Sequence, residues 1–338
     1  MNQTDDSKPK EDAPRTNQIR AASGRRASSL SSFLKLVVSL GLLAFVLNRI
    51  GWEETRRTLL EADILWLWAA LAVALLSMVV RALRWKLLLD ALDVRLSLAR
   101  LTQLYLVGAF FSTFLPTSVG GDVVRAYEVA QQSDRPAAAV GTVLLDRATG
   151  LLMLFAMALV AVAVRGSLAS GPISAAIVLL ALFGWGALLL LLQKSLLEKL
   201  GILRLLRRFR PAAEVYEAMH ATGPRAIAGA LAVSVAMNVL LITMNVCIGR
   251  ALGVNISLGY FFLFVPIVAA LLMVPISLRG LGIREGAYVY LFAQAGVPSS
   301  LALTMGLLVY AAETATSLLG GILYAAQSLL ELRAQDRA

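Results

Sequence analysis

Long apolar runs recur along this sequence and restrict the folds open to it. Runs at about 33–50, 64–80 and 138–164 approach or exceed the roughly 20 apolar residues that a helix needs to cross a bilayer. Hydrophobic residues make up 59% of the 338-residue chain, well above the share in soluble globular proteins. Because backbone groups inside lipid must be hydrogen bonded within the chain, we predict an all-α polytopic membrane protein.

The composition also predicts how the chain is divided. Residues 1–32 are polar and rich in Ser, Asp, Lys and Arg, and we expect a disordered cytoplasmic tail rather than a signal peptide. Residues 33–330 are predicted as one transmembrane domain with about eight membrane passes or half-passes. We expect a first repeat at about 64–192 and a second at about 226–330, joined by a basic cytoplasmic segment, 194–224.

The net charge of +10 comes from basic residues clustered in tails and loops beside the apolar runs. This is the pattern that orients membrane proteins, and it argues against a nucleic-acid partner because no basic folded domain remains. Segment 195–209 fits either an amphipathic helix on the cytoplasmic headgroups or a plain basic loop. With one cysteine, Cys247, and one histidine, His220, we expect no disulfide, no metal site and no cofactor.

Two segments interrupt the apolar runs and resemble each other. "LPTSVGGDVVRAYEV" from Leu115 and "VPISLRGLGIREGAY" from Val274 share the pattern P-x-S-x-x-G-x-x-x-R. The aligned pairs are Pro116 with Pro275, Ser118 with Ser277, Gly121 with Gly280, and Arg125 with Arg284. The copies also differ, because Gly120 and Asp122 of the first are Arg279 and Leu281 in the second.

The charge distribution predicts how these breaks lie in the membrane. If 101–115 crossed fully, the basic segment 194–210 would lie outside, against the positive-inside rule. We therefore expect the chain to enter to mid-depth, break at 116–121 and return, with the second break entered from the other side. Such re-entrant breaks in an inverted repeat are typical of secondary transporters. The predicted positions are cytoplasmic for both termini and 131–136, and outside for 165–171 and 296–299.

A broken helix at mid-membrane suggests an anion site. Backbone N–H groups at a new helix start bind phosphate well, and Arg125 and Arg284, about one turn into these helices, would add charge-assisted hydrogen bonds. A charge at the bilayer centre costs roughly 2.5–3.5 kcal/mol on insertion scales, so these residues need partners or a wet cavity. The alternative is internal pairing that only holds the fold, Arg125 with Asp122 or Glu128 and Arg284 with Glu285.

The candidate site residues follow from the two aligned segments and from the polar groups in neighbouring apolar helices. The predicted substrate-binding residues are Ser118, Gly120, Gly121, Asp122, Arg125, Ser277, Arg279, Gly280, Arg284 and Glu285. The candidates for proton coupling or for pairing with the arginines are Glu128, Asp146, Arg147 and Glu313. Asn238 and Asn245 share one helix face and fit either helix–helix hydrogen bonding or ligand binding.

Four stretches carry a family resemblance: "RALRWKLLL", "FFSTFLPTSVGGDVVRAYEVA", "LLDRATGLL" and "PISLRGLGIREGAYV". They resemble the lysylphosphatidylglycerol synthase transmembrane family, also called the flippase-like domain family, over about 33–330. In the similar multiple peptide resistance factor proteins, this N-terminal flippase region is fused to a cytoplasmic aminoacyl-transferase domain, which we expect this chain to lack. The resemblance implies lipid translocation, with an anionic lipid or a polyprenyl-phosphate-type lipid as the partner.

The leading prediction is a protein of the bacterial cytoplasmic membrane that moves an anionic lipid or lipid-linked phosphate between leaflets. It would not be an enzyme, and without G-x-x-x-x-G-K-[ST] it would carry no nucleotide motor of its own. One alternative is a membrane enzyme acting on lipid phosphate, and another is a non-transporting partner of a separate lipid-modifying enzyme. The sequence leaves open the lipid, the direction of transport, the coupling ion and whether the chain forms a homodimer.

Overall fold

The computed structural model describes residues 41, 52–114, 120–133, 135–164, 171–272 and 280–335. Regular secondary structure in these residues is entirely helical, which confirms the predicted all-α class. The predicted tail, 1–32, and the predicted first span, 33–50 except for Gly41, lie outside the described residues.

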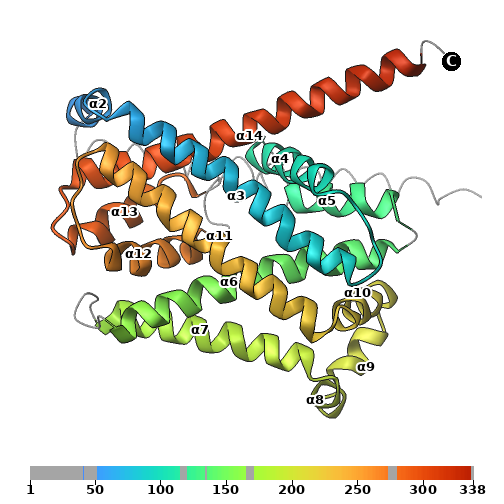
Figure 1. The fold of residues 1–338 in the computed structure, drawn as a ribbon. Helices are drawn as coiled ribbons and strands as arrows, with labels where there is room; N and C mark the ends of the chain where they lie inside the picture. The colour runs from blue at the N-terminus through green and yellow to red at the C-terminus, as the bar shows by residue number, and fades with distance from the viewer. Residues whose placement is uncertain are drawn as a thin grey trace, which may run out of the picture.

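The helices are labelled as in Figure 1. They are α2 (Trp52–Leu60), α3 (Ile64–Asp90), α4 (Leu98–Phe114), α5 (Gly120–Gln131), α6 (Pro136–Val164), α7 (Gly171–Leu192), α8 (Lys194–Lys199), α9 (Ile202–Arg207), α10 (Arg210–Ala221), α11 (Gly223–Ala251), α12 (Leu258–Leu271), α13 (Ile283–Ala293) and α14 (Ser299–Gln335). In the described part of the chain, four are long and apolar enough to cross a membrane: α3, α6, α11 and the Ser299–Gln327 part of α14. Shorter apolar stretches lie in α7 and α12.

An antiparallel pair, α3 and α11, forms the centre of the bundle (Figure 1). The Asp63 N–H donates to the Ala251 carbonyl at 2.8 Å, which joins the start of α3 to the end of α11. The Asp63 carboxylate also accepts from the Leu65 N–H at 2.9 Å and so caps α3. Toward the other end, Leu88 of α3 and Ile227 of α11 share one buried cluster.

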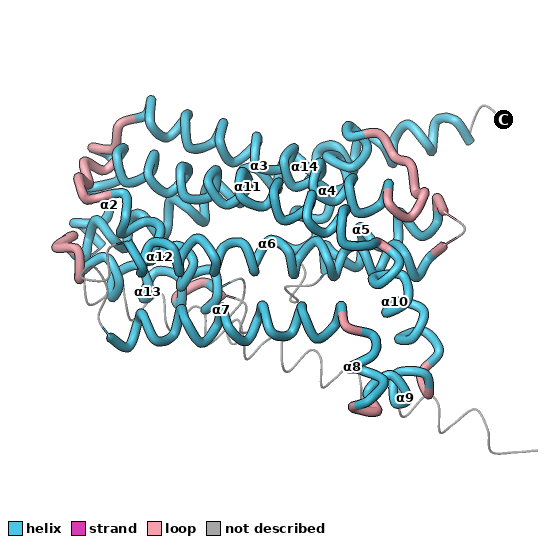
Figure 2. Tube along the Cα trace, turned by 60° about the horizontal axis from the view of Figure 1, so that its bottom comes forward, coloured by secondary structure: helices cyan, strands magenta, loops and turns pink. Residues whose placement is uncertain are grey.

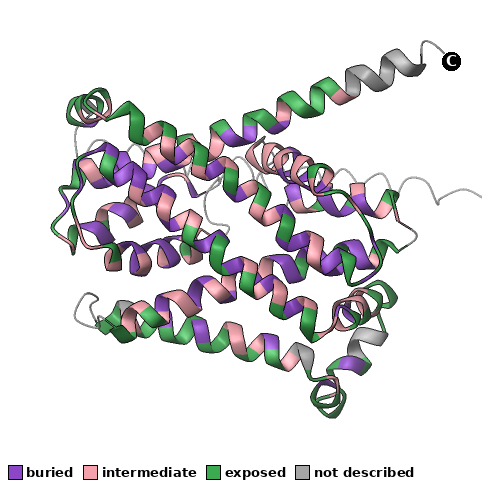
Figure 3. Ribbon diagram, viewed as in Figure 1, coloured by how far each residue is buried: buried purple, intermediate pink, exposed green. Residues whose placement is uncertain are grey.

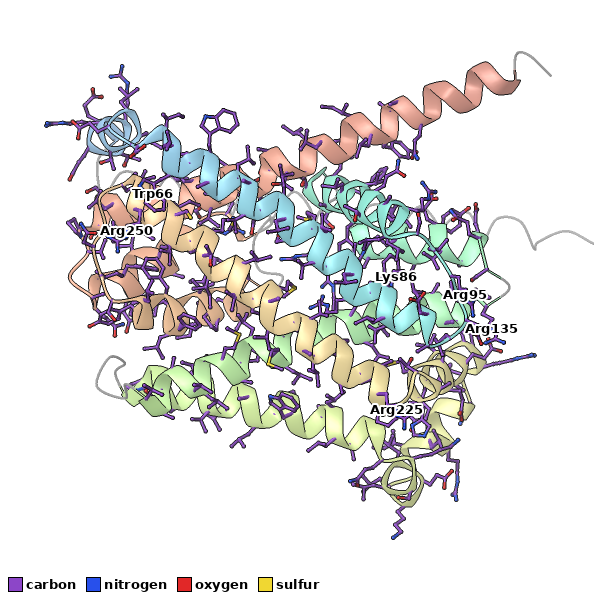
Figure 4. All side chains as sticks on the ribbon, in the orientation of Figure 1. Trp66, Lys86, Arg95, Arg135, Arg225 and Arg250 are labelled. Carbon is purple, nitrogen blue, oxygen red and sulfur yellow. The ribbon has the colours of Figure 1, made fainter. Side chains whose placement is uncertain are left out.

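The two ends of the bundle differ in charge. Figure 4 labels four basic residues near one end: Lys86, Arg95, Arg135 and Arg225. We call this the basic end; it also carries α8, α9 and α10 (Figure 1). Trp66 and Arg250 mark the opposite end, where α2 lies and where acidic side chains outnumber basic ones over residues 52–63.

The first helical hairpin, which we call hairpin 1, consists of α4 and α5. The Arg100 guanidinium near the start of α4 pairs with Glu128 near the end of α5, with 3.2 Å between Nη2 and Oε2. Arg135, just before α6, donates to the Leu92 carbonyl just after α3, at 3.3 Å. Hairpin 1 therefore leaves the basic end and returns to it.

The second hairpin, hairpin 2, consists of α12 and α13. Phe261 near the start of α12 contacts Phe292 near the end of α13, with ring centroids 5.5 Å apart in a T-shaped arrangement. Val254, between α11 and α12, and Val297, between α13 and α14, belong to the same buried cluster. Hairpin 2 therefore leaves and returns to the opposite end.

The order of elements is the same in two parts of the chain. A long helix, a short hairpin and a long helix follow one another in α3 to α6 and again in α11 to α14. Each hairpin also packs on the last helix of the other part, α4 on α14 and α12 on α6. An inverted repeat at the predicted boundaries would produce this pattern, and it remains a prediction.

The basic segment between the two parts differs from its prediction. Segment 195–209 is neither a plain loop nor one amphipathic helix, because α8 and α9 are separated at Gly201, whose φ of 71° lies in the left-handed region. The sequence also did not predict α10, which packs on α6. Gly141 of α6 permits this packing, since an added Cβ would lie 3.1 Å from the Val215 carbonyl oxygen.

Apolar side chains cover much of the outer surface. Figure 2 shows α6 between α7 and the layer of α3 and α11, and Figure 3 shows that most of α7 is exposed. Leu179, Leu182 and Phe183 of α7 are among the exposed large apolar side chains. Such a surface is unfavourable in water and suits the lipid-facing surface of an integral membrane protein.

Candidate functional site

Two adjoining cavities lie between the two hairpins, inside the bundle. The first, of about 320 Å³, is lined by α3, α4, α6, α11, the start of α5 and Ala269 of α12, and we call it the hairpin-1 cavity. The second, of about 300 Å³, is lined by α3, α4, α11, α14, Arg147 of α6, Leu272 at the end of α12 and Arg284 of α13, and we call it the hairpin-2 cavity. Both are lined by Met78, Arg81, Ala109, Ser112, Arg147 and Leu241.

A buried carboxylate, Asp146 of α6, organises the hairpin-1 cavity. Its Oδ1 accepts from Arg84 Nε of α3 at 2.6 Å, and its Oδ2 accepts from the Tyr105 hydroxyl of α4. The Arg125 guanidinium of α5 adds an ion pair, with 3.6 Å between Nη1 and Oδ2. Arg84 further donates to Ser234 Oγ of α11 at 3.2 Å. Four neighbouring helices are therefore joined through one carboxylate.

Arg125 is held on several sides. Its Nη2 donates to Asp122 Oδ1 at 2.5 Å, and Asp122 also pairs with Arg147 of α6. The guanidinium carbon lies 3.9 Å from the Tyr105 ring centroid and 4.9 Å from that of Trp85, both within the range of cation–π attraction. One of the two internal pairings predicted for Arg125, with Asp122, is therefore present.

The other predicted partner of Arg125 is elsewhere. Glu128 pairs with Arg100 at the basic end of hairpin 1. The two residues are three apart on α5, but Glu128 is only partly buried and faces the start of α4. Glu128 is thus a pairing residue of the hairpin, and neither cavity has it in its lining.

In hairpin 2, the pairing predicted between Arg284 and Glu285 is wrong. Arg284 Nη2 instead donates to Glu313 Oε2 of α14 at 2.9 Å. Glu285 Oε2 accepts from the Gly282 N–H at 2.6 Å and caps α13. Adjacent residues on a helix do not face each other, which explains the different partners. Arg284 is also the second residue of α13, closer to the helix start than the predicted one turn.

The two aligned glycines are required for different reasons. Gly121 lies so close to α4 that an added Cβ would overlap the Gly108 carbonyl, and its N–H donates to Ser112 Oγ at 3.0 Å. Gly280 has a φ of 78°, in the left-handed region. An added Cβ there would also overlap the Leu272 side chain.

The structure brings together part of the predicted site. The residues that line a cavity are Gly121, Asp122, Arg125, Asp146, Arg147, Arg284, Glu313 and Asn238. Gly120 and Gly280 are buried beside the breaks and belong to neither lining, and Asn245 accepts from the Tyr288 hydroxyl. The remaining predicted residues, Ser118, Ser277 and Arg279, lie outside the described residues.

Sequence reasoning missed two arginines of α3, Arg81 and Arg84. Both line the hairpin-1 cavity, although in the sequence their stretch, "RALRWKLLL", contributed only to the family resemblance. Two arginines three residues apart, within a helix otherwise long and apolar enough to cross a membrane, were the available signal. In the described part of the chain, no carboxylate lies within ion-pair distance of Arg81.

The two cavities together carry excess positive charge. Their linings contain five arginines, Arg81, Arg84, Arg125, Arg147 and Arg284, and three carboxylates, Asp122, Asp146 and Glu313. Three buried guanidinium nitrogens, Arg81 Nε, Arg125 Nη1 and Arg284 Nη1, make no hydrogen bond to any residue that the structure describes. This arrangement can bind an anion with several oxygen acceptors.

The same residues offer little to a metal ion. Over the described ranges, no group of three His, Cys, Asp or Glu residues is close enough to hold one. The carboxylates of the cavities are instead engaged by arginines.

Comparison with known proteins identifies a family. The family described as "Lysylphosphatidylglycerol synthase TM region" matches residues 32–321. The chain has no match among curated proteins.

Proposed function

Because this chain belongs to the lysylphosphatidylglycerol synthase TM family, a membrane-associated and lipid-related family, we propose that it moves an anionic lipid between bilayer leaflets. The lipid would be a phospholipid or a lipid-linked phosphate of the bacterial cytoplasmic membrane. The observation that carries the proposal is the pair of arginine-rich cavities between two hairpins that start from opposite ends of the bundle.

The excess charge supports an anionic ligand. A charged side chain at the centre of a membrane costs roughly 2.5–3.5 kcal/mol on insertion scales, so arginines in excess of the carboxylates there indicate a function. A phosphate in the cavities would compensate the excess of arginines over carboxylates and accept hydrogen bonds from their free donors. If the arginines of the cavities served only to pair with carboxylates inside the protein, they would not need to outnumber those carboxylates.

The hairpins support movement between leaflets. Hairpin 1 would lead from the basic end to the cavities, and hairpin 2 from the opposite end. In many transporters, an inverted pair of broken helices of this kind lets a central site open to each side in turn. The headgroup would bind in the cavities while the tails stay in the bilayer. An apolar groove of about 420 Å³ lies between α6 and α12 and is lined by Met153, Met157 and Phe262 among others. It offers space for a lipid tail.

The proposal is tested with purified wild-type protein in phosphatidylcholine vesicles. A trace of phosphatidylglycerol with a fluorescent acyl chain reports the leaflet, because dithionite added outside destroys only the label in the outer leaflet. We expect label from the inner leaflet to become reactive in vesicles that contain the protein and to stay protected in empty vesicles. Phosphatidylglycerol that stays protected in both would contradict the proposal.

The same vesicles separate the proposal from its alternatives. After the assay, thin-layer chromatography should recover the lipid chemically unchanged. Lipid with a new mobility would favour a membrane enzyme acting on lipid phosphate. Unchanged lipid that never moves would favour a non-transporting partner of a separate lipid-modifying enzyme.

A further inference from the structure

Arg81 of α3 differs from every other arginine of the two cavities. Each of the others has a carboxylate partner: Arg84 has Asp146, Arg125 and Arg147 have Asp122, and Arg284 has Glu313. For Arg81, the described residues provide none, and its buried Nε has no hydrogen-bond partner among them. Among the cavity arginines, Arg81 is therefore the one without a carboxylate partner in the described part of the protein.

The position of Arg81 is equally distinctive. It lines both the hairpin-1 cavity and the hairpin-2 cavity. Arg125 lines only the first and Arg284 only the second. Arg147 also lines both cavities, but it forms an ion pair with Asp122. An anion that moved from Arg125 toward Arg284 would pass Arg81.

The neighbourhood makes this charge costly without a ligand. Arg84 lies three residues further along α3, so the two side chains emerge on the same helix face and repel each other. The carboxylate of Asp146 is already bound to Arg84 and Tyr105. Arg81 is partly buried, with its Nε fully buried. A guanidinium without a partner in such a place lowers stability, and such residues are typical of functional sites, where stability is exchanged for activity.

We propose that Arg81 is the anion-binding residue shared by the two cavities, and that it holds the lipid phosphate as the headgroup passes between hairpin 1 and hairpin 2. This inference rests on the proposed function. In this proposal, Arg125 lies on the hairpin-1 side of the headgroup's path, Arg284 on the hairpin-2 side, and Arg81 between them. The ligand chemistry is a phosphate group, which accepts several hydrogen bonds from a guanidinium.

The test compares Arg81→Gln and Arg81→Lys with Arg95→Gln, a matched loss of one exposed arginine at the basic end. Fluorescent phosphatidylglycerol and phosphatidylcholine with the same acyl chains are the probes. We expect Arg81→Gln to slow phosphatidylglycerol transfer by about tenfold or more, the loss expected for a hydrogen bond to a charged group. Arg81→Lys should retain part of the rate, and Arg95→Gln all of it.

Thermal unfolding in detergent separates binding from folding. Arg81→Gln should unfold at the wild-type temperature or higher, because it removes an uncompensated charge. A variant that loses stability and transfer together would overturn the inference and make Arg81 a structural residue. Wild-type transfer by a stable Arg81→Gln protein would overturn it as well, while leaving the proposed function intact.

Native mass spectrometry covers the case in which the wild-type protein moves no lipid and the proposed function fails. The protein is incubated with phosphatidylglycerol, and the fraction that retains one lipid is measured. If a smaller fraction of Arg81→Gln than of Arg95→Gln keeps a bound lipid, the assignment of Arg81 as a phosphate-binding residue is supported. Equal fractions would overturn that assignment too.

Discussion

A single carboxylate, Asp146, gathers side chains from three helices. Arg84, Tyr105 and Arg125 approach it from α3, α4 and α5. The sequence identified Asp146 as a pairing candidate because a lone acid in an apolar helix requires a partner. It did not identify Arg84, because a contact across 62 positions of the chain has no local signature.

The buried pair of Arg84 and Asp146 makes the first prediction. Replacing Arg84 with Met leaves Asp146 without its closest cation inside the bundle. Removing one partner of a buried ion pair costs about 3–5 kcal/mol, so we expect Arg84→Met to unfold at a clearly lower denaturant concentration. Arg225→Met, at an exposed position, is the control. An Arg84→Met protein as stable as the control would show that Arg125 and Tyr105 suffice to hold Asp146.

At the scale of elements, each hairpin depends on a glycine. The sequence located both breaks through their Pro and Gly residues, and a glycine at such a break can serve either close approach or positive φ. The structure assigns close approach to Gly121 and positive φ to Gly280. Composition could not decide between them, because the distance between α4 and α5 depends on tertiary packing.

A matched pair of substitutions tests the packing of hairpin 1. In Gly121→Ala, the new methyl group would overlap the Gly108 carbonyl, and overpacking of this kind typically costs about 1–3 kcal/mol. In Gly286→Ala, nothing lies within 4 Å of the added Cβ, so α13 should gain up to about 1 kcal/mol from its higher helix propensity. Opposite shifts of the two unfolding midpoints are expected. Equal midpoints would mean that α4 and α5 can separate without cost.

The short helices beyond the hairpins show the limit of pattern reasoning. α10 was not predicted because it is only 12 residues long and mixes charged residues with small apolar ones. Its helix is favoured by Pro211 near its start and by packing on α6. The long apolar helix α6 was predicted within a few residues, because membrane thickness fixes the length of such a helix.

At the scale of the whole molecule, hairpin 1 starts at the basic end and hairpin 2 at the opposite end. Counting positive charges from the sequence predicts the basic end to be cytoplasmic. The described helices are compatible with this orientation, since Arg135 and α8 to α10 lie at one end. The helices alone show this arrangement. An experiment in cells identifies which end of the bundle faces the cytoplasm.

Single-cysteine labelling in intact cells measures it. In a Cys247→Ser background, Gln132→Cys, between α5 and α6, should be protected from a membrane-impermeant maleimide. Ser299→Cys, at the start of α14, should react with it. Both native residues are exposed, so access to the reagent depends on the side of the membrane. Labelling of Gln132→Cys from outside would contradict the predicted topology.

The central claim is that the arginines of the two cavities recognise the headgroup of a lipid that changes leaflet. The most direct measurement is the ratio of phosphatidylglycerol to phosphatidylcholine transfer rates in wild-type, Arg125→Gln and Arg284→Gln vesicles, with monodisperse elution in detergent as the folding control. Loss of a hydrogen bond to a charged group, about 1.5–3 kcal/mol, predicts that either substitution lowers the ratio tenfold or more. If both variants fold and keep the wild-type ratio, the arginines are structural and the claim is contradicted.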